Sequence, residues 1–133
     1  MLSSVGHNRM LGQRYHAHGP DWLELAMPWS ERIVGNPATG SIAWAAVFTL
    51  VDNATGASAW LRRGGILPQV TIDLRIDQIR ESRRTATLIA RCACYRIEGS
   101  IAYVQGAAYD ESLDDPVCRV AGTYMMLEGD PLI

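Results

Sequence analysis

Lysine is absent from this 133-residue chain, and all twelve basic residues are arginine. Without lysine, the protein can neither form a Schiff base with a carbonyl substrate nor place a lysine in a phosphate-binding loop. The fourteen acidic residues outnumber these twelve arginines, which gives a formal net charge of −2. That balance gives no general attraction to nucleic acid or to an anionic membrane surface.

Cysteine is scarce, with only Cys92, Cys94 and Cys118 in the chain. Cys92 and Cys94 lie two apart in an apparent strand, so they share a face and are poorly placed to bridge each other. His16 and His18 have no third ligand type nearby, and no second cysteine pair supplies a zinc set. We therefore expect three small buried side chains in a reducing compartment, and no metal.

The N-terminal residues lack an apolar core flanked by basic residues, so they do not resemble a secretory signal. We expect residues 1–11 to form a loose polar segment, and the protein to be cytoplasmic. A length of 133 residues, with 48% hydrophobic and 20% charged residues, is typical of one soluble globular domain. We expect residues 1–133 to form that single domain.

The second half of the chain alternates between apolar and polar residues with period two, which predicts β-strands. These strands are expected at residues 68–80, 85–97, 100–109 and 117–127. In the first of them, the apolar residues Val70, Ile72, Leu74 and Ile76 are expected to share one face. An earlier pair of segments, 13–18 and 22–27, brackets the turn residues 19–21 and predicts a hairpin.

Residues 42–61 differ from the strands because they form one long apolar segment whose only charged residue is Asp52. About 20 apolar residues can span a bilayer, but Thr49, Asn53 and Ser58 place polar groups through this segment. We expect instead a helix buried in a protein core, capped by Ser41 and ended by residues 62–65. A hairpin, one long helix and a four-stranded meander together predict an α+β domain whose sheet curls around the helix.

A lone carboxylate in an apolar helix costs free energy to bury in its ionised form unless it is hydrogen-bonded or faces a cleft. The spacing around Asp52 leaves two interpretations open. In the first, Asp52 is structural: it lies on an exposed stripe of the helix, or it is neutral and bonded to a neighbouring polar group. In the second, Asp52 is a general base or nucleophile in a water-poor site.

Several segments carry a family resemblance that bears on this choice. Residues 36–40 read Asn-Pro-Ala-Thr-Gly, residues 50–54 read Leu-Val-Asp-Asn-Ala, residues 70–77 read Val-Thr-Ile-Asp-Leu-Arg-Ile-Asp, and residues 122–126 read Gly-Thr-Tyr-Met-Met. Together they resemble the acyl-CoA thioesterases of the phenylacetate-degradation type, over about residues 12–127. The resemblance implies the hotdog fold, in which a curved antiparallel β-sheet wraps a long central helix.

The same resemblance implies roles for single residues. It makes Asp52 the catalytic carboxylate, Asn36 a polar group that holds substrate or water, and Thr71 a hydroxyl opposite the carboxylate of the other subunit. Gly40 lies in the motif's turn, where a positive φ is easy for glycine. No cofactor is implied beyond the coenzyme A of the substrate. The implied assembly is a homodimer or a dimer of dimers, which open sheet edges also favour.

The chain departs from the family at Ala43-Trp44-Ala45, where the family has His-Gly-Gly. In the family, backbone N–H groups at this place polarise the thioester carbonyl. Backbone donors do not require glycine, and the start of a helix still offers a positive dipole end to an oxyanion. Three outcomes stay open for the Trp44 ring: it narrows the acyl pocket, stacks on an aromatic acyl group, or blocks the thioester.

Three arginines after the first strand of the meander, Arg80, Arg83 and Arg84, are candidates to meet the phosphates of coenzyme A. The alternative is a solvated basic rim. The sequence thus predicts an acyl-CoA thioesterase that uses Asp52 at a dimer interface. Its first rival is a hotdog protein that binds acyl-CoA without hydrolysis. A hotdog hydratase is a weaker rival, because no histidine falls in the helix region.

Overall fold

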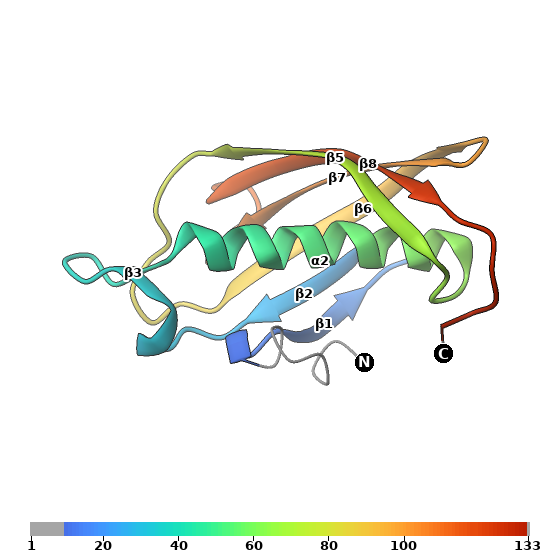
Figure 1. Ribbon diagram of the computed structural model, residues 1–133. Helices are drawn as coiled ribbons and strands as arrows, with labels where there is room; N and C mark the ends of the chain where they lie inside the picture. Colours follow the sequence, from blue (N-terminus) through green and yellow to red (C-terminus); the bar gives the residue numbers. More distant parts are fainter. Residues whose placement is uncertain (1–9, 133) are drawn as a thin grey trace.

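A computed structural model describes residues 10–132 and shows one long helix lying against the concave face of a curved antiparallel sheet (Figure 1). The helix is α2 (Trp44–Arg63). The strands are β1 (Arg14–His18), β2 (Leu23–Met27), β3 (Val34–Asn36), β4 (Ser41–Ile42), β5 (Gln69–Gln78), β6 (Leu88–Glu98), β7 (Ile101–Tyr109) and β8 (Cys118–Met126). A short 3-10 helix, η2 (Glu31–Ile33), precedes β3. This arrangement is the predicted α+β hotdog architecture.

Six strands form the main sheet in the order β1-β2-β6-β7-β8-β5, while β3 and β4 pair separately. The two hairpins β1–β2 and β6–β7 follow the predicted turns, and Gly99 takes a positive φ of 60° between β6 and β7. Strands β1 and β5 are the two edges of the sheet. Of the predicted N-terminal segment, residues 1–9 lie outside the described residues.

The ends of α2 only partly follow the expectation. Ala43 is the N-cap and makes no side-chain cap, so the predicted Ser41 cap is wrong; the Ser41 hydroxyl instead accepts a hydrogen bond from Thr39 at 3.2 Å. At the other end Gly64 takes a left-handed φ of 81°, and its N–H bonds to the carbonyl of Trp60 at 2.9 Å. Within residues 10–132, no helix is long and apolar enough to cross a membrane.

One side of α2 supplies the protein core. Val47, Leu50, Val51 and Ala54 are at most 1% exposed and pack against inward-facing residues of the sheet. The opposite side of the first turns is incompletely covered, with Ala45 exposed and Phe48, Thr49 and Asp52 half-buried. The single sheet therefore leaves a stripe of the helix open, and Asp52 lies on that stripe.

Strand β5 contains a β-bulge that changes which side chains face the helix. Thr71 pairs with Tyr124 and Asp73 with Thr123, so Ile72 is the extra residue. The shared face predicted for the four apolar residues of this strand is therefore wrong. After the bulge, Leu74 and Ile76 pack on the core as predicted.

Before the bulge the facing is reversed. Gln69 points to the helix, where its Nε2 donates to the carbonyl of Gly56 at 2.9 Å, and Thr71 reaches the Tyr124 hydroxyl. Val70 is 48% exposed, and the bulge residue Ile72 is 51% exposed. The bulge thus brings a hydroxyl to the inner face and leaves two apolar side chains uncovered at the sheet edge.

Candidate functional site

The carboxylate of Asp52 is held from the sheet by the last strand. The Tyr124 hydroxyl on β8 lies 3.1 Å from Asp52 Oδ1 and 2.9 Å from the Asp52 carbonyl oxygen. The Tyr124 ring is 4% exposed, whereas Asp52 is half-buried. Asp52 therefore lies on the incompletely covered stripe of the helix with one of its oxygens bonded to a buried phenol.

Two threonine hydroxyls surround the same phenol. Thr55 Oγ1 lies one helical turn beyond Asp52 and 2.8 Å from the Tyr124 hydroxyl, and Thr71 on β5 is paired opposite Tyr124 with its hydroxyl toward the phenol. Burial raises the pKa of Tyr124 to about 12; the Thr55 hydrogen bond opposes that rise, and the negative charge of Asp52 adds to it. The phenol therefore keeps its proton at neutral pH and can donate it to the carboxylate.

The start of α2 carries a second group of polar atoms. The N–H of Ala43 is already bonded to the carbonyl of Ile33 at 2.8 Å, so it is not available to a ligand. Trp44 and Ala45 are the first two residues of the helix, so their N–H groups have no carbonyl partner within it. These N–H groups also make no hydrogen bond to any other part of residues 10–132. Two adjacent donors at the positive end of a helix dipole can bind an anionic oxygen.

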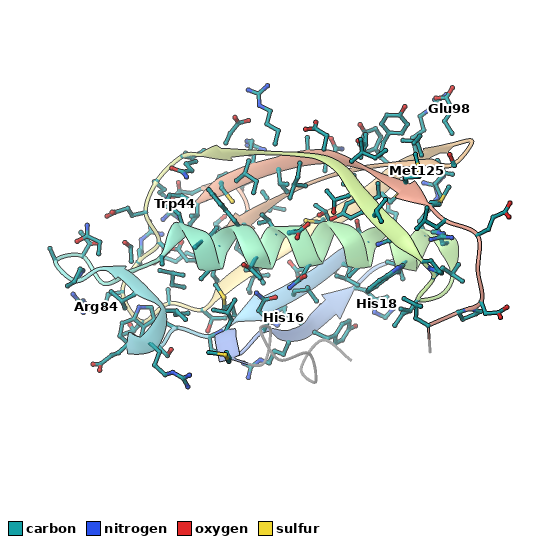
Figure 2. All side chains as sticks on the ribbon, viewed as in Figure 1. His16, His18, Trp44, Arg84, Glu98 and Met125 are labelled. Carbon is teal, nitrogen blue, oxygen red and sulfur yellow. The ribbon has the colours of Figure 1, made fainter. Side chains whose placement is uncertain are left out.

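Aromatic rings lie beside these donors. The Trp44 ring packs partly buried against the core, and its centroid is 6.2 Å from that of Phe48 one turn along α2. Figure 2 shows Trp44 at the first turn of the helix, with Arg84 at the same end of the molecule. The helix start thus combines two main-chain donors with an apolar aromatic wall.

The turn that leads into the helix is built by the predicted motif. Asn36 Oδ1 accepts the N–H of Ala38 at 3.1 Å, and Asn36 Nδ2 donates to Glu81 Oε1 at 3.1 Å. Gly40 takes a positive φ of 72°, and a Cβ there would lie 2.6 Å from the guanidinium carbon of Arg84. In this chain Asn36 therefore holds the turn, and no hydrogen bond joins it to Asp52 among the described residues.

The three predicted phosphate-binding arginines fall into two groups. Arg84 is exposed and donates to the carbonyl of Pro37 at 2.9 Å. Arg80 and Arg83 clamp the Asp110 carboxylate at 2.6 and 2.7 Å, and the Asp110 side chain is fully covered. Burial alone would raise the pKa of Asp110, but the hydrogen bonds and charges of the two arginines lower it to about 2. These two arginines are therefore committed to an internal ion pair.

The sequence-predicted residues thus gather at two places on one helix. Thr71 joins Asp52 through Tyr124, within the same chain, while Asn36, Gly40 and Arg84 gather around the helix start. Trp44 and Asp52 are eight residues apart on α2, which corresponds to about 12 Å along the axis. Sequence reasoning missed Tyr124, although a polar ring in the closing strand of the family motif was an available signal.

Potential metal ligands do not gather in the part of the chain that the structure describes. No group of three or more His, Cys, Asp or Glu side chains there could hold an ion. His16 and His18 lie exposed on β1 (Figure 2), and all three cysteines are buried and unbridged.

Comparison with known proteins identifies the family. The model of the thioesterase superfamily matches residues 40–117, which is more than half of the chain. The chain belongs to the thioesterase superfamily. The matched segment starts at the turn before α2 and includes Asp52, the helix start and β5. No curated protein matches this member of the superfamily.

Solved structures extend the likeness over nearly the whole chain. A Pseudomonas aeruginosa protein shares 29% identity with a TM-score of 0.86, covering 95% of this chain and 93% of that one. A Haemophilus influenzae thioesterase shares 21% identity with a TM-score of 0.82, covering 96% and 86% of the two chains. The E. coli PaaI protein, from the phenylacetic acid degradation operon, shares 16% identity with a TM-score of 0.81, covering 96% and 88%. The last two support the fold.

Proposed function

We propose that this thioesterase-superfamily protein hydrolyses an acyl-CoA thioester, with Asp52 as the general base or nucleophile. The observation that carries the proposal is the half-buried Asp52 carboxylate, whose Oδ1 accepts the buried Tyr124 hydroxyl. Superfamily membership supports the thioester as the bond that is cleaved. The three unbridged cysteines fit a reducing compartment, and we place the enzyme in the cytoplasm.

The separation along α2 supports a site shared by two chains. An attacking oxygen and the donors to the carbonyl oxygen must both lie within about 3–3.5 Å of the reacting group. Trp44 and Asp52 of one helix are about 12 Å apart along its axis, so one helix cannot supply both. Two antiparallel helices related by a twofold axis would bring Asp52 of one chain to the helix start of the other.

The exposed apolar edge of the sheet supports the same assembly. Val70 and Ile72 are uncovered on edge strand β5, and an unpaired edge with apolar side chains favours pairing with a second copy. A homodimer is then the smallest assembly that completes the site. Further association into a dimer of dimers stays a prediction.

In the proposed reaction, the thioester carbonyl oxygen accepts the N–H groups of Trp44 and Ala45. Asp52, acting as a base, takes a proton from water, and the hydroxide adds to the carbonyl carbon. The carbon–sulfur bond of the tetrahedral intermediate then breaks, and the departing thiolate takes the proton back from Asp52. If Asp52 attacks directly, an anhydride forms first and water cleaves it; the products are the same acid and free coenzyme A.

The surroundings of the helix start favour an aromatic acyl group and an anionic coenzyme. The Trp44 and Phe48 rings offer an apolar stacking wall beside the donors. Arg84 is the arginine best placed for a phosphate, because it is exposed near the same turn. All five N–H donors of Arg80 already have acceptors in Asp110, Asp115 and the Glu81 carbonyl. Arg83 stays a proposed phosphate ligand through the donors that Asp110 and Asp115 leave unused.

One observation favours a second function, acyl-CoA binding without hydrolysis. Trp44 places a large ring beside the donors where the family has glycine, and a ring that covers them would keep the thioester carbonyl away. The two functions differ in turnover, which release of free thiol from short, medium and aromatic acyl-CoAs measures directly.

The deciding variant is Asp52→Asn, which keeps the shape of the side chain and removes its basicity. We expect it to lose about 10²- to 10⁴-fold in kcat. Glu98→Gln serves as the matched control, because Glu98 is an exposed carboxylate on β6 that pairs with Arg96, away from the β5 edge; its activity should be that of wild type. Wild-type protein that binds acyl-CoA by calorimetry but turns over none of the panel would replace hydrolysis with the binding function.

A further inference from the structure

The hydrogen-bond network around Tyr124 has a direction. A carboxylate can only accept, so the proton between Tyr124 and Asp52 Oδ1 comes from the phenol. The Thr55 hydroxyl has two helix carbonyls as acceptors, those of Val51 and Asp52, each at 2.9 Å. Thr71 can then donate to the phenol oxygen, and the phenol can donate to Asp52.

We infer that Tyr124 is a positioning residue for the reaction, which fixes Asp52 through Oδ1 and leaves Oδ2 as the reactive oxygen, with Thr71 holding the phenol. This inference rests on the proposed catalytic role of Asp52. Tyr124 is buried on β8, and its hydroxyl lies between the main-chain carbonyl of Asp52 at 2.9 Å and Oδ1 at 3.1 Å, which ties the carboxylate to the helix backbone. Asp52 Oδ2 has no hydrogen bond to a described residue.

The bulge in β5 serves this arrangement. Strands alternate their side chains between faces, and a bulge shifts that alternation by one residue. Leu74 faces the helix after the bulge. In a regular strand Thr71, three residues earlier, would lie on the opposite face from Leu74. Because of the bulge both lie on the inner face, with Thr71 paired opposite Tyr124. The same irregularity that exposes Ile72 therefore delivers a hydroxyl to the site.

The groups that face Asp52 are few. Among the described residues, the side-chain hydrogen bonds to Asp52 come from Thr55 on α2 and Tyr124 on β8, and Tyr124 is the titratable one of the two. No ion pair to Asp52 is formed within residues 10–132. Removing the phenol hydroxyl therefore changes the main donor to this carboxylate and introduces no new charge.

The test is Tyr124→Phe, with Tyr109→Phe as its matched control. Tyr109 also donates to a carboxylate, that of Glu24, and burial together with Glu24 raises the pKa of Tyr109 to about 12. Tyr109 lies on the strand face away from α2, because its neighbour Ala108 is part of the core. Both variants lose one phenol–carboxylate hydrogen bond, but only one of these bonds is at the site.

For Tyr124→Phe we expect kcat to fall about tenfold and KM to stay within about twofold, because the hydrogen bond to a charged group orients the base and does not bind substrate. Thr71→Val should lower kcat by less. Tyr109→Phe should change neither kcat nor KM.

The readout that a merely structural role would not give is the split between kcat and KM, with the thermal unfolding midpoints of both variants as the measure of their stability. An unchanged kcat in Tyr124→Phe, or an equal fall in Tyr109→Phe, would overturn the positioning role. Absence of turnover in the wild type would instead overturn the thioesterase proposal, so the two failures are told apart.

Discussion

Replacing Trp44 by proline and by alanine separates the main-chain donor at the helix start from the ring that it carries. Proline is well accepted at the first helical position, where its fixed φ suits the helix. The residue before a proline must be extended, and Ala43 already is, with φ −56° and ψ 135°. The Trp44 N–H has no partner in the described chain, so proline removes no internal hydrogen bond.

Both variants lose the ring, but only Trp44→Pro loses the N–H. Removal of one oxyanion donor costs about 10²- to 10³-fold in kcat, or roughly 3–4 kcal/mol. We therefore expect Trp44→Ala to turn over about 10²- to 10³-fold faster than Trp44→Pro, with equal thermal unfolding midpoints. Trp44→Ala should also accept a wider range of acyl groups than wild type if the ring lines the acyl pocket.

The same variant tests whether the site is shared between two chains. When Trp44→Pro and Asp52→Asn chains are expressed together, each mixed dimer has one site with an intact carboxylate and an intact helix start. Random pairing makes half of the dimers mixed, so about a quarter of wild-type activity should return. A site contained in one chain would recover nothing. Equal rates for Trp44→Pro and Trp44→Ala, with both folded, would refute the donor role.

Three further results are expected. Asp110→Asn should lower the free energy of unfolding by about 2 kcal/mol, measured in urea at pH 7 and fixed protein concentration, because the folded pKa of Asp110, about 2, lies below the usual value of 3.8. This contribution to stability is present above pH 4 and is lost as the pH falls toward 2. An equal loss of stability at pH 2 and pH 7 would contradict it. Val70→Arg should place like charges across a β5–β5 contact and shift the mass seen by light scattering toward monomer, with loss of activity, whereas Tyr95→Arg on β6 should do neither. Burial raises the pKa of Cys92, Cys94 and Cys118, so a thiol reagent should label them only after unfolding; rapid labelling of the native protein would contradict that burial.

Much of the fold follows from patterns that are local in sequence. The period-two segments, together with the turn residues 19–21, predict the hairpins, because alternation and turn residues act over a few positions. The long helix was placed to within two residues at either end. The short strands β3 and β4 were missed, since their formation depends on the main-chain bond from Ala43 to Ile33 and on the turn at Gly40.

The errors come from interactions that alternation does not encode. A bulge is fixed by the register between β5 and β8, and the four apolar residues of β5 look regular without that partner. The predicted Ser41 cap failed for a related reason, since the chain bends after β4 and starts the helix two residues later. Tyr124 was missed because its contact with Asp52 joins residues 72 apart in sequence.

The altered motif at residues 43–45 now has a physical interpretation. The donors to a thioester carbonyl are main-chain N–H groups, and their direction is set by the helix, which forms here with alanine and tryptophan as its first residues. In the proposed site, side chains other than proline at these positions would change the shape of the acyl pocket without removing the donors. The carboxylate, in contrast, is positioned by side chains from α2, β5 and β8. Substitution at the helix start by residues other than proline should then alter which acyl group is accepted, whereas substitution around Tyr124 should alter the rate for every acyl group alike.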